Sequence, residues 1–201
     1  MRLGIYGGSF DPVHYGHLLL AECCRETLGL NEVWFVPAAS PPHKQDRTLA
    51  SGKARLEMLE LALAGHEQLR ASPIELARGG VSYTVDTLQA VRQMRPEAVL
   101  YLLMGADSLR DLPTWREPAR ICELALPAVV RRGGAPEPDF AVLAPLVTRE
   151  RLAEIRAAQV QMPLIELSST EMRDRIAAGR SIRFRTPRAV EVYIQTHALY
   201  R

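Results

Sequence analysis

The stretch GGSFDPVHYGH, residues 7–17, lies between an apolar run at residues 3–6 and an apolar-periodic run at residues 18–28. This order predicts a strand, a glycine-rich turn and the start of a helix. The exposed backbone N–H groups of such a turn attract anions, above all phosphates. His14 and His17 then project from one side of the same helical turn, because side chains three residues apart are neighbours on a helix. A phosphate cradle beside two imidazoles predicts chemistry at a phosphorus atom.

The size and charge of the chain limit its architecture and its partners. Its 201 residues suffice for one α/β domain with a substantial core. Lys and Arg number 25 and Asp and Glu number 23, so the net charge is +2. This balance argues against nucleic acid or an anionic membrane as a partner. The longest apolar stretch, residues 98–104, is far shorter than the roughly 20 residues that a membrane span needs.

The cysteines and the start of the chain indicate the cellular compartment. Cys23, Cys24 and Cys122 form an odd set without the spacing of a metal site, which is typical of reduced thiols in a cytosolic protein. Residues 1–3 lead directly into a predicted strand, so we expect no signal peptide. Both features predict a cytoplasmic protein.

Apolar runs alternate with helical patterns along the chain, which predicts βαβ units and a mostly parallel sheet in one domain. We expect strands at residues 2–6, 32–37, 70–76, 99–104, 126–131 and 162–167. We expect helices near residues 16–28, 52–64, 84–94, 115–124, 148–158, 169–178 and 188–197.

Distinctive residues follow several of these strands. They are GGS at residues 7–9, PPHK at 41–44, GADS at 105–108, RRGG at 131–134 and SSTEMR at 168–173. In an open parallel sheet the carboxyl ends of the strands share one edge, and ligands bind there. We therefore expect these segments to meet at one site.

The SSTEMR segment also has an explanation without a ligand. Ser168 and Glu171 fit a capping box, which would account for both residues. Arg173 fits that explanation poorly, because a cation in the first turn of a helix faces the positive end of the helix dipole. A polyphosphate at this helix N-terminus would remove the unfavourable interaction and bind the arginine, the hydroxyls and the N–H groups together.

The other candidates carry similar alternatives. His14 and His17 could cap or pack a helix start, or bind a metal, although a third and a fourth ligand are not evident. Gly16 between them leaves room for a flat or bulky group to approach the backbone. Asp107 could accept hydrogen bonds from ribose or serve as an N-cap, and Trp115 could stack on a base or belong to the core. The motifs GxxxxGK[ST], GxGxxG and GxSxG do not occur, which argues against a P-loop, an ordinary dinucleotide-binding fingerprint and an α/β-hydrolase.

Taken together, the motifs resemble those of the HxGH nucleotidyltransferase superfamily and, within it, of bacterial nicotinate-nucleotide adenylyltransferases. The matching motifs are GGSFDPVHYGH, PPHK, SYTVDTL, GADSLRDLPTW, SSTEMR and the closing VEVYIQTHALY, in this order from Met1 to Arg201. The resemblance implies an α/β, Rossmann-like open sheet with helices on both faces, in a single nucleotidyltransferase domain over residues 1–201. It implies transfer of the adenylyl group of ATP to nicotinate mononucleotide, which gives deamido-NAD and pyrophosphate.

The resemblance also implies the roles of individual residues. The catalytic residues would be His14, His17 and Arg173, and ATP would also contact Gly7, Gly8, Ser9, Phe10, Gly16, Ser168, Ser169 and Thr170. Nicotinate mononucleotide would contact Lys44, Thr84, Val85, Gly105, Asp107, Trp115, Arg131 and Arg132. Within this set, the backbone of Thr84 and Val85 would read the carboxylate, Asp107 would hold the ribose and Trp115 would stack on the pyridine. Lys44 and one of the two arginines would lie near the phosphate. Mg²⁺ would be carried by ATP without dedicated protein ligands.

Two departures from the family pattern concern the mononucleotide phosphate. Ala38-Ala39 follow Pro37 where many relatives have Asn, and Arg132-Gly133-Gly134 stand where relatives often read R-P-G.

Two alternatives stay open: a sibling transferase that uses nicotinamide mononucleotide or phosphopantetheine, and a nucleotide-binding regulator without turnover. Intact histidines and an intact SSTEMR favour the enzyme. The small-molecule partners would be ATP and nicotinate mononucleotide, and a homo-oligomer is compatible with the sequence.

Overall fold

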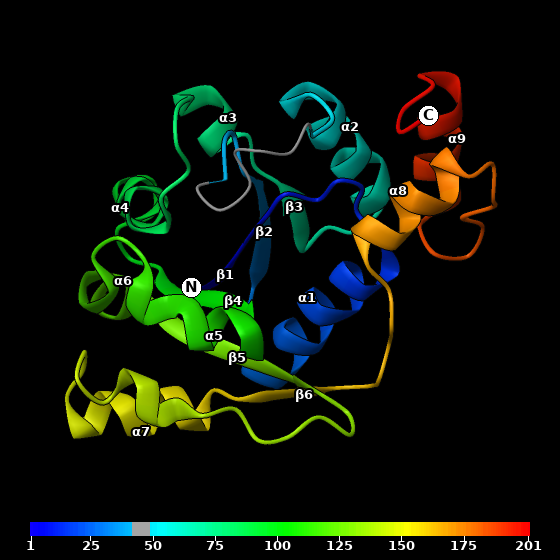
Figure 1. The fold of residues 1–201 in the computed structure, drawn as a ribbon. Coiled ribbons are helices and arrows are strands. Elements are labelled where there is room, and N and C mark those ends of the chain that lie inside the picture. Colours follow the sequence, from blue (N-terminus) through cyan, green and yellow to red (C-terminus); the bar gives the residue numbers. More distant parts are fainter. Residues whose placement is uncertain (42–48) are drawn as a thin grey trace.

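A parallel six-stranded sheet organises the protein, whose computed structural model describes residues 1–41 and 49–201. The strands pair in the order β3-β2-β1-β4-β5-β6 (Figure 1). Their bounds are β1 Arg2–Gly8, β2 Glu32–Pro37, β3 Leu69–Ala71, β4 Val99–Gly105, β5 Leu126–Arg132 and β6 Val160–Met162. The strand order reverses between β1 and β4, and ligands bind at the carboxyl ends of the strands at such a switch point.

Helices lie between successive strands, and two more follow the last strand. Among the described residues they are α1 Tyr15–Leu28, α2 Gly52–Leu63, α3 Ile74–Arg78, α4 Thr84–Met94, α5 Ala106–Asp111, α6 Pro118–Leu124, α7 Arg149–Ala157, α8 Ser169–Ala177 and α9 Arg188–Thr196. Two short 3₁₀ turns, η1 Leu112–Thr114 and η2 Phe140–Leu143, complete the set.

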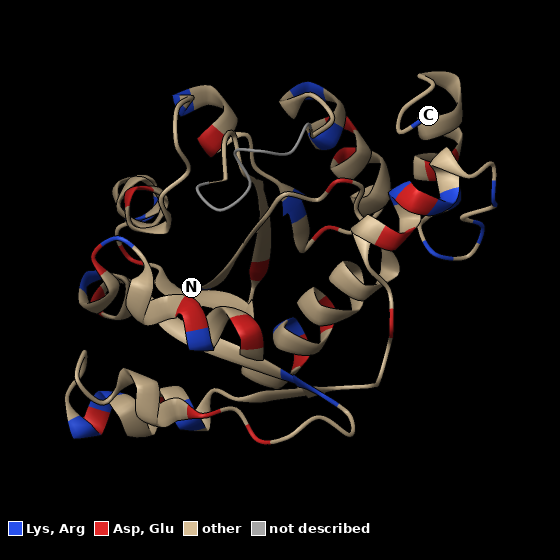
Figure 2. Cartoon of the chain, viewed as in Figure 1, with Lys and Arg blue, Asp and Glu red and all other residues tan. Residues whose placement is uncertain are grey.

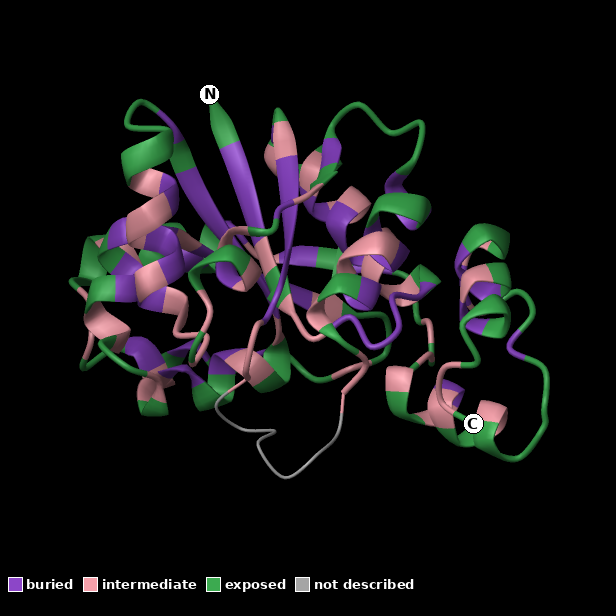
Figure 3. Ribbon diagram, turned by 90° about the horizontal axis from the view of Figure 1, so that it is seen from above, coloured by how far each residue is buried: buried purple, intermediate pink, exposed green. Residues whose placement is uncertain are grey.

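Each face of the sheet carries its own apolar core, because successive side chains of a strand point to opposite faces. Leu102 of β4 is buried in a cluster with Leu88 of α4 and Ile121 of α6. Its neighbour Leu103 is buried in a second cluster with residues of α1 and α2, among them Met58. Figure 3 shows the buried strands between the two layers of helices. The predicted α/β fold with helices on both faces is confirmed.

Most predicted elements agree with the structure. The predicted strands at residues 2–6, 32–37, 99–104 and 126–131 match β1, β2, β4 and β5 to within two residues at each end. Six predicted helices match α1, α2, α4, α7, α8 and α9 equally closely. Long, strongly periodic segments are therefore the part of the fold that local sequence determines.

Two predicted strands continue past the ends of the observed ones, and the one predicted at residues 162–167 shares only Met162 with β6. The predicted strand at residues 70–76 is a three-residue β3 followed by helix α3, whose N-cap is Pro73. The predicted strand at residues 162–167 is wrong beyond β6, which ends one residue before Pro163. Proline has no N–H to donate to a ladder, so β3 ends two residues before Pro73 and β6 ends one residue before Pro163.

The predicted helix at residues 115–124 begins later, at Pro118, and the preceding residues 106–114 form α5 and η1 instead. Proline favours the first helical position because the missing N–H has no intrahelical partner there. Trp115 follows the 3₁₀ turn with an extended backbone and is not helical. This arrangement places Trp115 in a connecting segment at the carboxyl end of the sheet.

The C-terminal part of the chain lies against the loop that leads into α1. The Ser169 hydroxyl donates a hydrogen bond to the Pro12 carbonyl at 2.9 Å, and the Thr186 hydroxyl donates to the Val13 carbonyl at 2.8 Å. The Tyr15 N–H donates to the Arg185 carbonyl at 3.0 Å. Figure 1 shows α8 beside the start of α1. Both ends of the chain therefore build the region around residues 9–17.

Acidic and basic residues are interspersed along the ribbon (Figure 2). In the described part of the chain, no helix combines the length and apolar character needed to cross a bilayer.

Candidate active site

A cavity of about 630 Å³ opens at the carboxyl ends of β1 and β4. Its volume is in the range of sites for small molecules. The predicted residues that line it are Gly7, Gly8, Ser9, Phe10, His14, Gly16, His17, Thr84, Gly105, Asp107, Trp115, Arg132, Ser168, Ser169, Thr170 and Arg173. The structure thus brings together segments that lie far apart in the sequence. Among the described residues, Val85 and Arg131 do not line the cavity, and Lys44 lies outside the described residues.

The two histidines stand at the first turn of α1. Gly7 and Gly8 still belong to β1, so the turn begins at Ser9, two residues later than the sequence suggests. His14 is the N-cap residue, and its backbone N–H donates to Nδ1 of His17 at 3.2 Å. Because Nδ1 of His17 accepts this bond, the proton of a neutral His17 is on Nε2.

His14 is buried, with an exposed fraction of 6%. Burial, and next the Arg132 guanidinium, lower the pKa of His14 from 6.5 to about 4. The ring is therefore neutral at neutral pH and donates one N–H. Its Nδ1 is buried and has no hydrogen-bond partner among the described residues.

Gly16 has a role that the sequence did not reveal. A Cβ atom on Gly16 would lie 3.0 Å from Nδ1 and 3.1 Å from Cε1 of His14. The space beside this glycine is therefore occupied by the His14 ring, and any larger residue would displace the imidazole.

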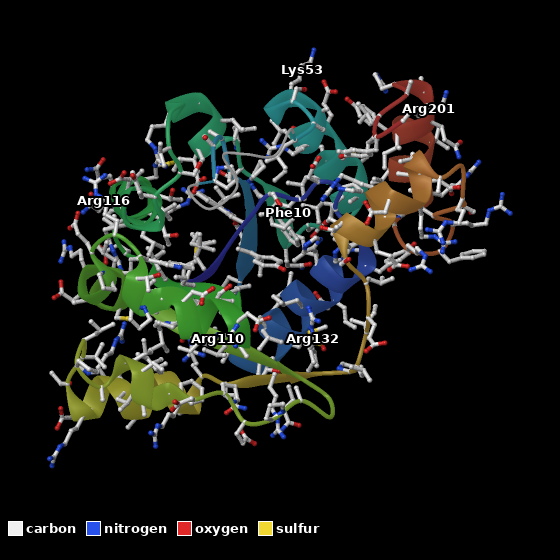
Figure 4. All side chains as sticks on the ribbon, viewed as in Figure 1. Phe10, Lys53, Arg110, Arg116, Arg132 and Arg201 are labelled. Atoms are coloured by element: carbon white, nitrogen blue, oxygen red, sulfur yellow. The ribbon has the colours of Figure 1, made fainter. Side chains whose placement is uncertain are left out.

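Phe10 supports the second imidazole from the core side. Its ring is buried and meets the His17 ring edge to face, with 5.1 Å between centroids. A Cβ on Gly8 would lie 3.0 Å from the Phe10 ring, so Gly8 gives this phenyl group its space. Figure 4 shows Phe10 near the centre of the molecule.

Helix α8 brings Arg173 to the same cavity. Its Nη1 donates to the Asp11 carbonyl at 2.6 Å, and its Nη2 donates to the Thr170 hydroxyl at 3.1 Å. The Ser168 hydroxyl accepts the Glu171 N–H at 3.1 Å, as the predicted cap requires. The Glu171 carboxylate, however, pairs with Arg185 at 3.1 Å. Two imidazoles, a guanidinium and a helix N-terminus therefore line one cavity.

The two adjacent arginines of β5 point in different directions. Arg132 lines the cavity, whereas the Arg131 Nε–H donates to the Ala135 carbonyl at 2.8 Å and its guanidinium pairs with Glu137. This divergence follows from the alternation of side chains along a strand. Arg132 shares the face of Val130, whose cluster also holds residues of α1.

The far end of the cavity is lined by the start of α4 and by the segment around Trp115. Val85 is fully buried in the core, so its side chain is unavailable to a ligand and its backbone alone could contact one. The Asp107 carboxylate is exposed and pairs with Arg110 at 2.9 Å. Figure 4 shows Arg110 beside α5 and Arg116 beside α4, where it pairs with Asp86 at 3.7 Å.

The sequence reasoning missed several polar residues of the site. Glu75 and Thr87 line the cavity, and the Thr87 hydroxyl donates to the buried Glu75 carboxylate at 2.6 Å. The guanidinium of Arg116 lies over the Tyr83 ring, 4.8 Å from its centroid. Asp11 is fully buried beside Arg173. The position of Asp11 within the GGSFDP stretch was the one signal that could have indicated it.

Metal ligands do not cluster in the described part of the chain: no three or more His, Cys, Asp or Glu side chains are grouped to hold an ion. The carboxylates that line the cavity, those of Glu75 and Asp107, are engaged by Thr87 and Arg110.

Comparison with known proteins gives a consistent result. Residues 5–175 match the family model of cytidylyltransferase-like proteins. The chain is 46% identical over 199 residues to a probable nicotinate-nucleotide adenylyltransferase of Rhodopirellula baltica, covering 99% of this chain and 93% of that protein. It is 44% identical over 201 residues to one of Thermus thermophilus, covering 100% of both.

Solved structures share the fold. The nicotinic acid mononucleotide adenylyltransferase of Plasmodium falciparum, solved in complex with NaAD, matches with a TM-score of 0.74 and 19% identity. The match covers 99% of this chain and 97% of that one.

Proposed function

The chain belongs to the cytidylyltransferase-like family and, within it, to the nicotinate-nucleotide adenylyltransferases, and we propose from this that it makes nicotinate adenine dinucleotide for NAD biosynthesis. The reaction transfers the adenylyl group of ATP to nicotinate mononucleotide and releases pyrophosphate. One observation carries the proposal: a single cavity joins His14, His17 and Arg173 to Thr84 and Trp115. We also propose that residues 1–201 act as a single nucleotidyltransferase domain, since contacts from residues 169–186 hold the loop before α1.

In the proposed mechanism, a phosphate oxygen of nicotinate mononucleotide attacks the α-phosphorus of ATP in line. A new P–O bond forms while the bond between the α-phosphorus and the bridging oxygen breaks, and that electron pair leaves with pyrophosphate. The nucleophile is already an anion, so no base has to remove a proton. Catalysis then depends on positioning the two nucleotides and on stabilising the negative charge that is spread over the phosphate oxygens in the transition state.

The two imidazoles suit that task as hydrogen-bond donors. His14 is neutral because its pKa is about 4, and a neutral His17 carries its proton on Nε2. Each ring would donate an N–H to phosphate oxygens of ATP in the transition state. Neither ring has to act as a general base.

The leaving pyrophosphate would be stabilised at the start of α8. Ser169 and Thr170 form its first turn, and Arg173 adds a fixed positive charge. Free N–H groups at a helix N-terminus and a guanidinium bind phosphate cooperatively. The Arg173 guanidinium already donates to Asp11 and Thr170, so it is oriented before a ligand arrives.

Mg²⁺ would enter bound to ATP. Glu75 and Asp107, the carboxylates of the lining, already have partners, so we propose that the phosphates supply the ion's ligands. The ion would neutralise charge on the triphosphate.

The pyridine end would be read by the start of α4 and by Trp115. The backbone N–H groups of Thr84 and Val85 lie at a helix N-terminus, which favours a carboxylate over a neutral amide. The indole would stack on the pyridine ring. Arg132 would bind the mononucleotide phosphate, a role for which Lys44 was also predicted.

We further propose that the enzyme works in the cytoplasm, since none of its described cysteines forms a disulfide.

One assay tests the substrate assignment. The purified protein is incubated with MgATP and, separately, with nicotinate mononucleotide, nicotinamide mononucleotide or phosphopantetheine, and pyrophosphate release is measured. We expect the fastest release with nicotinate mononucleotide. Preference for the amide or for phosphopantetheine would overturn the substrate assignment, and no release with any acceptor would support the non-catalytic regulator.

A further inference from the structure

Tyr200, the penultimate residue, reaches the loop that carries the histidines. Its hydroxyl donates a hydrogen bond to Oδ1 of Asp11 at 2.6 Å, across 189 residues of sequence. Asp11 has an exposed fraction of 0%. A fully buried carboxylate is unfavourable unless it is paired and hydrogen-bonded, so the hydrogen bond from Tyr200 stabilises Asp11 in its buried position.

Asp11 in turn touches Arg173 at two points. The Arg173 Nη1 donates to the main-chain carbonyl of Asp11 at 2.6 Å and lies 3.7 Å from its Oδ2. That Oδ2 is buried and accepts no hydrogen bond from the described part of the chain. The Asp11 carboxylate therefore has one oxygen held by Tyr200 and the other facing the guanidinium.

The surroundings hold this arrangement in place. The Ala50 N–H donates to Oδ1 of Asp11 at 3.2 Å. The buried Arg55 donates to the carbonyls of Ser9 at 2.9 Å and of Ala50 at 3.0 Å. Burial, and next the charge of Asp11, raise the pKa of Tyr200 above its ordinary value, so the phenol keeps its proton and remains the donor.

We propose that Tyr200 is a positioning residue for Arg173 and acts through the Asp11 carboxylate. By holding Oδ1, the Tyr200 hydroxyl keeps the carboxylate from turning both oxygens to the guanidinium in a bidentate pair. Arg173 then contacts Asp11 mainly through the carbonyl and leaves its charge available to phosphate. The role in turnover rests on the proposed function, whereas the effect on phosphate binding does not.

The direct test is Tyr200→Phe, which removes the hydroxyl and keeps the ring. The matched control is Tyr193→Phe, because the Tyr193 phenol also donates to a carboxylate, that of Glu57 on α2. For Tyr200→Phe we expect kcat/KM for ATP to fall about tenfold to a hundredfold, the scale of a misplaced catalytic group. For Tyr193→Phe we expect kcat/KM within about twofold of the unsubstituted protein, since no reacting group is displaced. All assays run well below each variant's thermal midpoint, so that folding does not contribute.

A double-mutant cycle separates positioning from general stability. In an Arg173→Ala background, Tyr200→Phe should cause no further loss of kcat/KM. An equal loss in both backgrounds, or equal losses in Tyr200→Phe and Tyr193→Phe, would overturn the proposal.

Calorimetry with inorganic tripolyphosphate gives a readout that needs no turnover. We expect Tyr200→Phe to weaken tripolyphosphate binding about tenfold when Arg173 is present and not at all when it is alanine. If the unsubstituted protein releases no pyrophosphate with any acceptor, the proposed function fails, and this binding cycle still decides the role of Tyr200. Unchanged tripolyphosphate affinity in Tyr200→Phe would refute the proposal that Tyr200 positions Arg173.

Discussion

The imidazole rings of His14 and His17 stack with their centroids 3.7 Å apart and their planes 19° from parallel. This contact arises because His14 is the N-cap of α1 and His17 lies one turn later, on the same side. Two imidazolium ions at that distance would repel each other, so the stacked pair favours neutral rings. Under the proposed mechanism, the pair acts as one rigid donor unit at the cavity.

Replacing His17 by alanine should remove one donor of this unit. We expect turnover to fall about 10²-fold to 10³-fold, the usual effect of losing a single transition-state donor, with the fold retained. Steady-state pyrophosphate release and circular dichroism measure the two effects. The control is His197→Ala, since His197 is exposed and stacks on Tyr193. Turnover of His17→Ala equal to that of His197→Ala would show that His17 is not catalytic.

Gly16→Ala should separate stability from activity. The new Cβ would lie 3.0 Å from Nδ1 of His14, so the ring must shift by a few tenths of an ångström. Alanine is also the better helix former, by up to about 1 kcal/mol. We therefore expect an unfolding midpoint equal to or above that of the unsubstituted protein, together with about tenfold lower kcat. Unchanged kcat would mean that the position of the His14 ring does not matter.

The adjacent arginines of β5 provide a matched pair of variants. Arg132→Ala should raise the KM for nicotinate mononucleotide about tenfold to a hundredfold, the scale of a lost hydrogen bond to a charged group. Arg131→Ala should leave that KM unchanged, because Arg131 is bound to Ala135 and Glu137. KM is measured for both substrates at saturation of the other. Equal effects of the two variants would contradict the assignment of the phosphate to Arg132.

The pH dependence of stability should report the buried His14. Its pKa is about 4 when folded and 6.5 as the unperturbed value, so the unfolded state binds more protons between these values. His14 therefore contributes stability that is present above about pH 6.5 and is lost as the pH falls toward about 4. Between about pH 7 and about pH 5 the loss amounts to about 2 kcal/mol.

The variant His14→Asn, which keeps an N-cap residue, should lose less stability over the same range. The free energy of unfolding is measured by urea titration at both pH values for both proteins. Other groups also titrate between these pH values. The contribution of His14 is therefore the loss of stability in the unsubstituted protein minus the loss in His14→Asn. If the two proteins lose the same stability on acidification, His14 is not the buried neutral imidazole described above.

Several features of this protein could be predicted from the sequence because they depend on local pattern. Apolar periodicity located six helices and four strands, and the histidines, SSTEMR and GADS follow strand ends, which meet at one edge in a parallel sheet. Local pattern also failed where proline interrupted an apolar run. Residues 70–76 and 162–167 contain apolar side chains that suggested strands, but Pro73 and Pro163 cannot donate to a ladder.

The sequence by itself thus determined the α/β class, the segments that build the site and the chemistry that they suggest. Only the tertiary structure decided which of Arg131 and Arg132 lines the cavity and that Gly16 makes room for the His14 ring. It also decided that the Tyr200 hydroxyl donates a hydrogen bond to Asp11. The physical reason is that these relationships depend on where side chains point and on contacts between residues up to 189 positions apart. Such contacts are set by the packing of the whole chain, which no local pattern encodes.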